Sequence, residues 1–205
     1  MTKIINFIAL VCLVPAMPIF AEPVPAGQVL KLIPQNRIVA GDFEQTKTML
    51  DLEIDLKSAG KFVFSKNDGA LWQTDVPAKA TILISKESLT FFDKEDKIVQ
   101  EIKIGASAMA QEIVQIINDA MLGDVAALEK YFELNAQTEN GGWRLELSPK
   151  ESSLPFSAIT ICGNGGEVSD IHFLNDSKDE STHIKLKNIQ RDRNESLEAF
   201  KKFEK

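Results

Sequence analysis

Apolar and polar residues alternate along most of this chain, and this period of two limits its possible folds more than any other feature. Side chains alternate between the two faces of a β-strand, so the pattern predicts strands with one buried and one wet face. Turn residues such as Asn67-Asp68-Gly69 separate the strands and favour antiparallel hairpins. We predict about ten strands, at residues 50–56, 62–64, 70–74, 81–85, 89–93, 98–104, 143–147, 156–162, 168–174 and 183–186. An antiparallel sheet of this length must curl, close or split.

The period changes to that of a helix at residues 109–120, where apolar side chains gather on one side. Gly123 can end this helix, and Asp124 can begin a second short helix that runs to about Phe132. Residues 195–205 have the composition of a polar helix or a frayed tail. A helical pair inserted near the middle of a curled sheet can cover the mouth of that sheet.

The first 21 residues have the pattern of a secretory signal. Lys3 precedes an apolar run over residues 4–14, and Ala21 ends a segment typical of a cleavage site. We therefore expect export, with residues 22–205 forming one domain. That mature segment keeps a single cysteine, Cys162, in an apolar strand, where we expect a buried thiol.

Composition and spacing argue against several classes of function. The net charge is −7, and no cluster of Lys and Arg indicates a nucleic-acid surface. His172 and His183 are eleven residues apart without a ligand motif, so we expect two strand surface residues and no metal site. Asp51, Glu53 and Asp55 are expected to form a solvated strand face rather than an acid–base pair. We predict a protein that is not an enzyme and has no cofactor.

Apolar side chains on four successive predicted strands are the features that remain. They are Phe62, Phe64, Trp72, Ile82, Ile84 and Phe91. A hydrophobic core explains them about as well as a ligand cavity does, and composition does not separate the two.

Four short segments together resemble the LolA-type outer-membrane lipoprotein carrier family. They are Asp-Phe-Glu-Gln-Thr at 42–46, Gly-Lys-Phe-Val-Phe-Ser-Lys at 60–66, Leu-Trp at 71–72, and Pro77. The order of elements is also similar along nearly the whole mature chain. The resemblance implies an incomplete, strongly curved antiparallel β-barrel covered by a helical lid. It also implies a periplasmic carrier that takes acylated cargo from an inner-membrane donor complex to an outer-membrane acceptor.

The resemblance further implies which residues form the site. The apolar cavity would be lined by Phe43, Phe62, Phe64, Trp72, Ile82, Ile84 and Phe91. The underside of the lid would carry Met109, Ile113, Ile116, Ile117 and Met121. In the family an arginine on the Gly-initiated strand holds the lid, and Lys66 stands at the matching position. We expect Lys66 to contact the lid or a cargo head group, without the planar hydrogen-bonding fork of arginine.

Two functions remain open at this point. The first is a monomeric carrier for the acyl chains of a lipoprotein or another envelope lipid, such as a glycolipid. The second is a non-catalytic periplasmic adaptor that binds a protein partner through a sheet edge or a groove. The two differ in whether the apolar residues surround a space that cargo can enter.

Overall fold

The computed structural model describes residues 22–34, 36–103, 125–150 and 156–203, which build one long antiparallel sheet with short helices. Its strands are β1 (Glu22–Val24), β2 (Ile38–Met49), β3 (Ile54–Ser65), β4 (Gly69–Val76), β5 (Ala80–Ile84), β6 (Ser88–Phe92), β7 (Ile98–Lys103), β8 (Phe132–Glu139), β9 (Gly142–Pro149), β10 (Phe156–Asn164), β11 (Glu167–Asn175) and β12 (Glu180–Arg191). The helices are α1 (Ala26–Leu30), η1 (Leu50–Leu52, a 3₁₀ turn), α3 (Val125–Tyr131) and α4 (Glu195–Lys201). Within these residues, no helix is long and apolar enough to span a bilayer.

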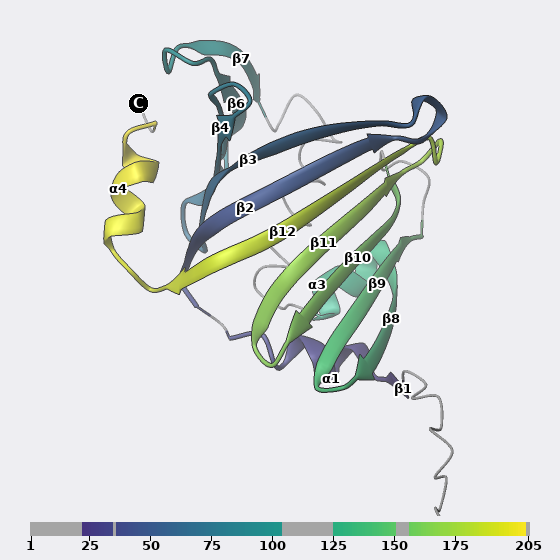
Figure 1. Cartoon of the computed structure of the whole chain (residues 1–205). Helices are drawn as coiled ribbons and strands as arrows, with labels where there is room; N and C mark the ends of the chain where they lie inside the picture. Colours follow the sequence, from purple (N-terminus) through teal and green to yellow (C-terminus); the bar gives the residue numbers. More distant parts are fainter. Residues whose placement is uncertain (1–21, 35, 104–124, 151–155, 204–205) are drawn as a thin grey trace, which may run out of the picture.

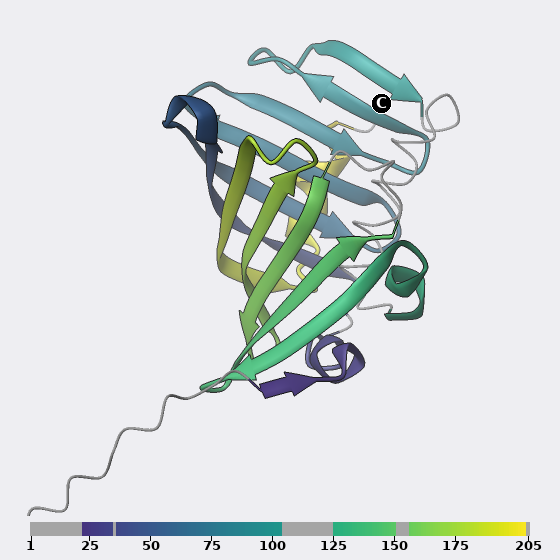
Figure 2. The same cartoon turned by 90° about the vertical axis from the view of Figure 1, so that its right-hand side faces the viewer.

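The strand order makes the sheet an open, curved half-barrel. The order is β1-β8-β9-β10-β11-β12-β2-β3-β4-β5-β6-β7, and the long β12–β2 ladder joins the two halves of the chain. The edge strands β1 and β7 lie far apart in both views (Figure 1 and Figure 2). The predicted fold class is thus confirmed, with twelve strands instead of about ten. The predicted strands left out β1, which is too short to show a period, β2, because the first strand was predicted to begin only at residue 50, and β8, which directly follows a helix.

The prediction of one continuous strand at residues 50–56 is wrong, because the tip of the β2–β3 hairpin lies within this segment. Residues 50–52 form the 3₁₀ turn η1, and Glu53 has φ 53°, so the chain reverses there. The apolar residues of this segment are therefore at a hairpin tip, the dark blue end of β2 and β3 in Figure 1. Their side chains are 44–61% exposed, and they are Leu50, Leu52, Ile54 and Leu56. Asp51, Glu53 and Asp55 consequently do not share one strand face.

The helices lie on opposite faces of the sheet. The face that we call inner packs α1 and α3 against β8, β9 and β10, with Leu30 and Leu128 buried beside Leu145 and Leu147. The other face, called outer, packs α4 against β2–β6.

The C-terminal segment is neither a purely polar helix nor a frayed tail. Phe200 and Phe203 are 1% and 7% exposed, and they pack on Val63, Leu71 and Leu83. The two phenylalanines are three residues apart, which places them on the same side of the segment and lets both reach the sheet.

One carboxylate ties the end of β12 to the start of β2. Asp192 Oδ1 accepts hydrogen bonds from the backbone N–H groups of Arg37 (2.9 Å) and Ile38 (3.1 Å). Its Oδ2 accepts one from Asn36 Nδ2 (2.7 Å). These hydrogen bonds hold the pKa of Asp192 below its ordinary value because they favour the charged form, and the hydrogen bond from Asn36 contributes most.

We expect Asp192→Asn to make stability less sensitive to acid. The pKa of Asp192 is lower in the folded than in the unfolded chain, where it is about 3.9. Its contribution is therefore complete above that pH and is lost as the pH falls through the folded pKa. Urea unfolding at pH 7, 4 and 3 should show a larger loss in the wild type than in Asp192→Asn. The control is Asp176→Asn, at an exposed turn residue, and equal losses in all three proteins would contradict the assignment.

Candidate functional site

The strand register places all seven predicted cavity residues on the inner face. Phe62 on β3 stands opposite Trp72 on β4, Trp72 opposite Ile82 on β5, and Ile82 opposite Phe91 on β6. Side chains two apart on a strand share a face, so Phe64 joins Phe62 and Ile84 joins Ile82. Phe43 on β2 lies two residues from Gly41, the partner of Phe62, and therefore shares that face as well. The role of these residues in binding lipid stays a prediction.

Three aromatic side chains of this face contact one another. Phe43 is 1% exposed, and its ring stacks on Trp72 with centroids 4.0 Å apart and planes 26° apart. Trp72 also stacks on Phe62 at 5.9 Å. Phe43 reaches Trp72 across β3 because its partner on that strand is Gly60, which has no side chain. In this structure the three rings therefore fill space with one another.

The rest of the inner face is apolar but only half covered. Trp72 is half-buried, and so are Ile82, Ile84 and Phe91. On the other half of the sheet, Ile171 and Phe173 are also half-buried, and both contact each of the two inner clusters of buried residues. The apolar surface is therefore continuous from β8 to β6. A surface of this kind can bind hydrocarbon without any directed hydrogen bond.

A small crevice opens on this face beside Phe62. It has a volume of about 50 Å³ and a mostly apolar lining that includes Val39, Leu186 and Ile189. Typical ligand pockets measure roughly 300–1,000 Å³. An acyl chain thus requires side chains or neighbouring segments to move apart before it can enter here.

The structure describes Lys66, the residue predicted to hold the lid, but not the predicted lid itself. Met109, Ile113, Ile116, Ile117 and Met121 lie outside the described residues, as does the predicted signal at 1–21. Lys66 directly follows β3 and is exposed, and its backbone N–H donates a hydrogen bond to the Arg37 carbonyl at 2.9 Å. The contact of its side chain with a lid or head group stays a prediction.

The cysteine lies on the outer face of β10. Cys162 is half-buried opposite Asp170 of β11. Burial, with a further contribution from the charge of Asp170, raises the pKa of its thiol, so the protonated form dominates at neutral pH. Cys162 thus lies in a strand as expected, but it is half-buried instead of buried.

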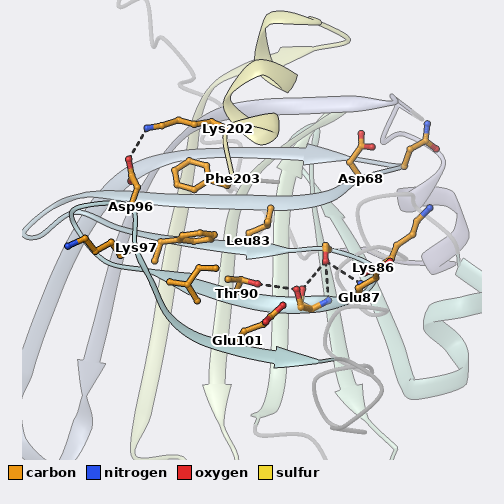
Figure 3. A pocket seen from close by; sticks show the side chains of 15 residues that line it. Asp68, Leu83, Lys86, Glu87, Thr90, Asp96, Lys97, Glu101, Lys202 and Phe203 are labelled. Atoms are coloured by element: carbon orange, nitrogen blue, oxygen red, sulfur yellow. Dashed lines mark hydrogen bonds and ion pairs between the residues drawn. The ribbon is translucent and has the colours of Figure 1, made fainter. Parts of the chain in front are cut away.

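A larger open pocket, of about 950 Å³, lies on the outer face between β5–β7 and α4 (Figure 3). Phe92 and Phe203 meet edge to face at 5.0 Å on its wall, and Lys202 pairs with Asp96 at 2.8 Å. Charged residues interrupt the apolar wall, which makes it a poor match for an acyl chain. Sequence analysis missed this pocket because its wall forms only when α4 is docked on the sheet. The spacing of Phe200 and Phe203 could have indicated that this segment has an apolar side.

The two histidines form the second feature that sequence analysis missed. His172 of β11 lies directly opposite His183 of β12, and their rings stack. The ten residues between them span a hairpin whose register no ligand motif reveals.

Comparison with known proteins agrees with this geometry. The family described as "Outer membrane lipoprotein carrier protein LolA" matches residues 35–202. Outer-membrane lipoprotein carrier proteins of Cupriavidus pinatubonensis and Cupriavidus taiwanensis are 26% and 24% identical to this chain over 196 and 195 residues, and each alignment covers 91% of this chain and 89% of the relative. A solved domain of Vibrio parahaemolyticus, described as that of an outer membrane lipoprotein-sorting protein, shares the fold. Its TM-score is 0.50 at 12% identity, over 88% of this chain and 97% of that domain. The chain therefore belongs to the LolA family of outer-membrane lipoprotein carrier proteins.

Proposed function

We propose that this protein is a non-catalytic periplasmic carrier that shields acyl chains on its inner face. The cargo is a lipoprotein or another acylated envelope lipid, taken from an inner-membrane donor complex and passed to an outer-membrane acceptor. Residues 22–205 act as one exported domain after removal of residues 1–21. The observation that carries the proposal is the continuous apolar inner face, which is only half covered from Trp72 to Phe91. Membership of a family of lipoprotein carriers supports it.

Simple energetics make this face suitable for a carrier. Burying one methylene group is worth about 0.8 kcal/mol, so shielding ten is worth about 8 kcal/mol before ordering costs. Such contacts are not directional, which lets an acceptor with a better apolar surface remove the cargo. Trp72 is the one half-buried ring among the three stacked aromatics, so turning it aside costs less than moving Phe43. Its rotation would free the face of Phe62 on which it stacks and so enlarge the apolar surface open to an acyl chain.

We expect Ile82→Lys to abolish lipid binding while the fold is kept. Ile82 is half-buried between Trp72 and Phe91 on the inner face, so a charge there must be desolvated whenever an acyl chain covers it. The measurement is titration of delipidated protein with a fluorescent fatty acid. The wild type should show saturable one-site binding, and Ile82→Lys should lose at least about 90% of it.

The matched control is Gln73→Lys. Gln73 is half-buried on the neighbouring strand but points to the outer face, as the residue next to Trp72. It should retain wild-type binding. Equal losses in both variants, or no saturable binding by folded wild type, would count against the carrier. Mass spectrometry of lipid extracted from the natively purified protein would then identify the cargo class.

One observation favours the adaptor as a second candidate. β7 is an edge strand, and its residues Ile98 and Val99 are 58% and 65% exposed among the described residues. An open apolar edge can accept a strand from a partner protein. If Val99→Pro removed partner capture from an envelope extract while lipid was absent from the native protein, the adaptor would be the better account.

A further inference from the structure

A compact set of potential metal ligands lies on the outer face of β11 and β12. The rings of His172 and His183 stack with centroids 3.9 Å apart and planes 12° apart. Asp170 Oδ1 is 2.8 Å from His183 Nε2. The ligand atoms of the three residues all lie within 4.8 Å of one another. The chain has only two histidines in 205 residues, and the fold brings both to this one place.

We propose that Asp170, His172 and His183 bind one divalent late first-row transition metal, such as Zn²⁺. Imidazole nitrogen and carboxylate oxygen are ordinary ligands of these ions, with Zn–N distances of about 2.0–2.1 Å. Two nitrogens on one tetrahedral ion are then about 3.4 Å apart. The present spacing can close to that value through side-chain rotation, without a change in the strands. Three protein ligands leave the fourth position to water.

The scaffold under these ligands is rigid and open on the correct side. β11 and β12 are internal strands of the sheet, because β11 also pairs with β10 and β12 also pairs with β2. His172 is exposed, and the side chains of His183 and Asp170 are 34% and 29% exposed, so an ion can reach all three. Asp170 Oδ1 accepts a hydrogen bond from His183 Nε2, so these two ligand atoms already face each other, and a bound ion would take the place of the proton between them.

The charges around the three residues act on a cation in opposite directions. Lys185 stands opposite Asp170 and opposes binding, while Arg144 is engaged by Glu146 at 2.9 Å. The carboxylate of Asp170 supplies the negative charge within the set. Because this site is on the outer face and the acyl surface is on the inner face, the metal proposal is independent of the proposed carrier function.

Zinc titration of untagged protein tests the site, since a histidine tag would itself bind the metal. Isothermal calorimetry should show one Zn²⁺ per chain. At a Zn²⁺ concentration 100 times Kd, the melting temperature should rise by about 5–10 °C. His172→Gln, His183→Gln and Asp170→Asn should each weaken binding by at least about tenfold.

The control is Glu180→Gln, which removes a carboxylate of β12 that pairs with Lys47 and should leave binding unchanged. Far-UV circular dichroism confirms that each variant is folded. The proposal is overturned if the folded wild type shows no saturable binding. It is also overturned if the double variant His172→Gln/His183→Gln still binds Zn²⁺, or if Asp170→Asn binds as tightly as the wild type.

Discussion

Phe43→Ala is expected to lower the free energy of unfolding by about 3–5 kcal/mol. Phe43 is 1% exposed and packs with Phe62 and Ile184 on the inner face. Its truncation removes buried area and leaves a cavity that β2 and β3 cannot easily collapse, because both continue as paired strands on either side. It also removes the stacking on Trp72, worth about 0.5–1.5 kcal/mol. Urea unfolding followed by circular dichroism measures the loss.

Leu52→Ala is the matched control for this prediction. Leu52 is a large apolar residue on the adjoining hairpin tip, but it is 61% exposed. Its truncation should change stability by less than about 0.5 kcal/mol. A double-mutant cycle between Phe43→Ala and Trp72→Ala should give a coupling of about 0.5–1.5 kcal/mol. Equal effects of Phe43→Ala and Leu52→Ala would mean that the inner aromatic residues are not packed as described.

Much of the inner face could be predicted because its determinants are local. The turn at 67–69 fixes the β3–β4 register, which sets Phe62 opposite Trp72. Strand parity then assigns Phe64 to the same face as Phe62 without further information. The row continues to Ile82 and Phe91 because β4, β5 and β6 follow one another through short connections. From β3 to β6 each strand pairs with the next strand in the sequence, so the order of these residues in the chain also gives their order across the sheet.

The hairpin tip could not be predicted because its alternation continues through a turn. Residues 50–56 alternate as a strand does, yet the chain reverses at Glu53 in a left-handed conformation. What fixes the reversal is distant in sequence, since Met49 at the end of β2 pairs with Glu180 at the start of β12. The backbone N–H of Leu50 also donates a hydrogen bond to the Asp179 carbonyl at 2.7 Å, so the last contact before the reversal is again with a distant part of the chain.

The features of the outer face could not be predicted either, because they depend on contacts that sequence patterns do not reveal. Phe200 and Phe203 lie among charged residues, and only the docking of α4 on Val63 and Leu83 makes them core. The histidine pair follows from the β11–β12 turn: once it is centred on residues 176–179, His172 falls opposite His183. Local pattern therefore predicted which strands form, while features that join separate strands or helices needed the structure.

Gly60→Ala should be the second most damaging substitution, with an expected loss of about 3 kcal/mol. A Cβ at this position would lie 1.9 Å from the Gln73 carbonyl oxygen and 2.9 Å from the Thr74 Cα. Both are backbone atoms of β4, so no flexible side chain can turn away, and β4 itself must shift from β3. The contact is this close because the β3–β4 register is irregular between Ala59 and Gly60.

The shift would also disturb the aromatic stack, because Gly60 is the partner of Phe43 and Gln73 is next to Trp72. We therefore expect Gly60→Ala to change the fluorescence of Trp72 as well as the urea midpoint. Gly165→Asn is the control: nothing lies within 4 Å of a Cβ there, and asparagine tolerates its φ of +52°. That variant should stay within about 0.5 kcal/mol of the wild type. If Gly60→Ala lowered the free energy of unfolding as little as Gly165→Asn, β3 and β4 would not approach each other at Gly60 as closely as described.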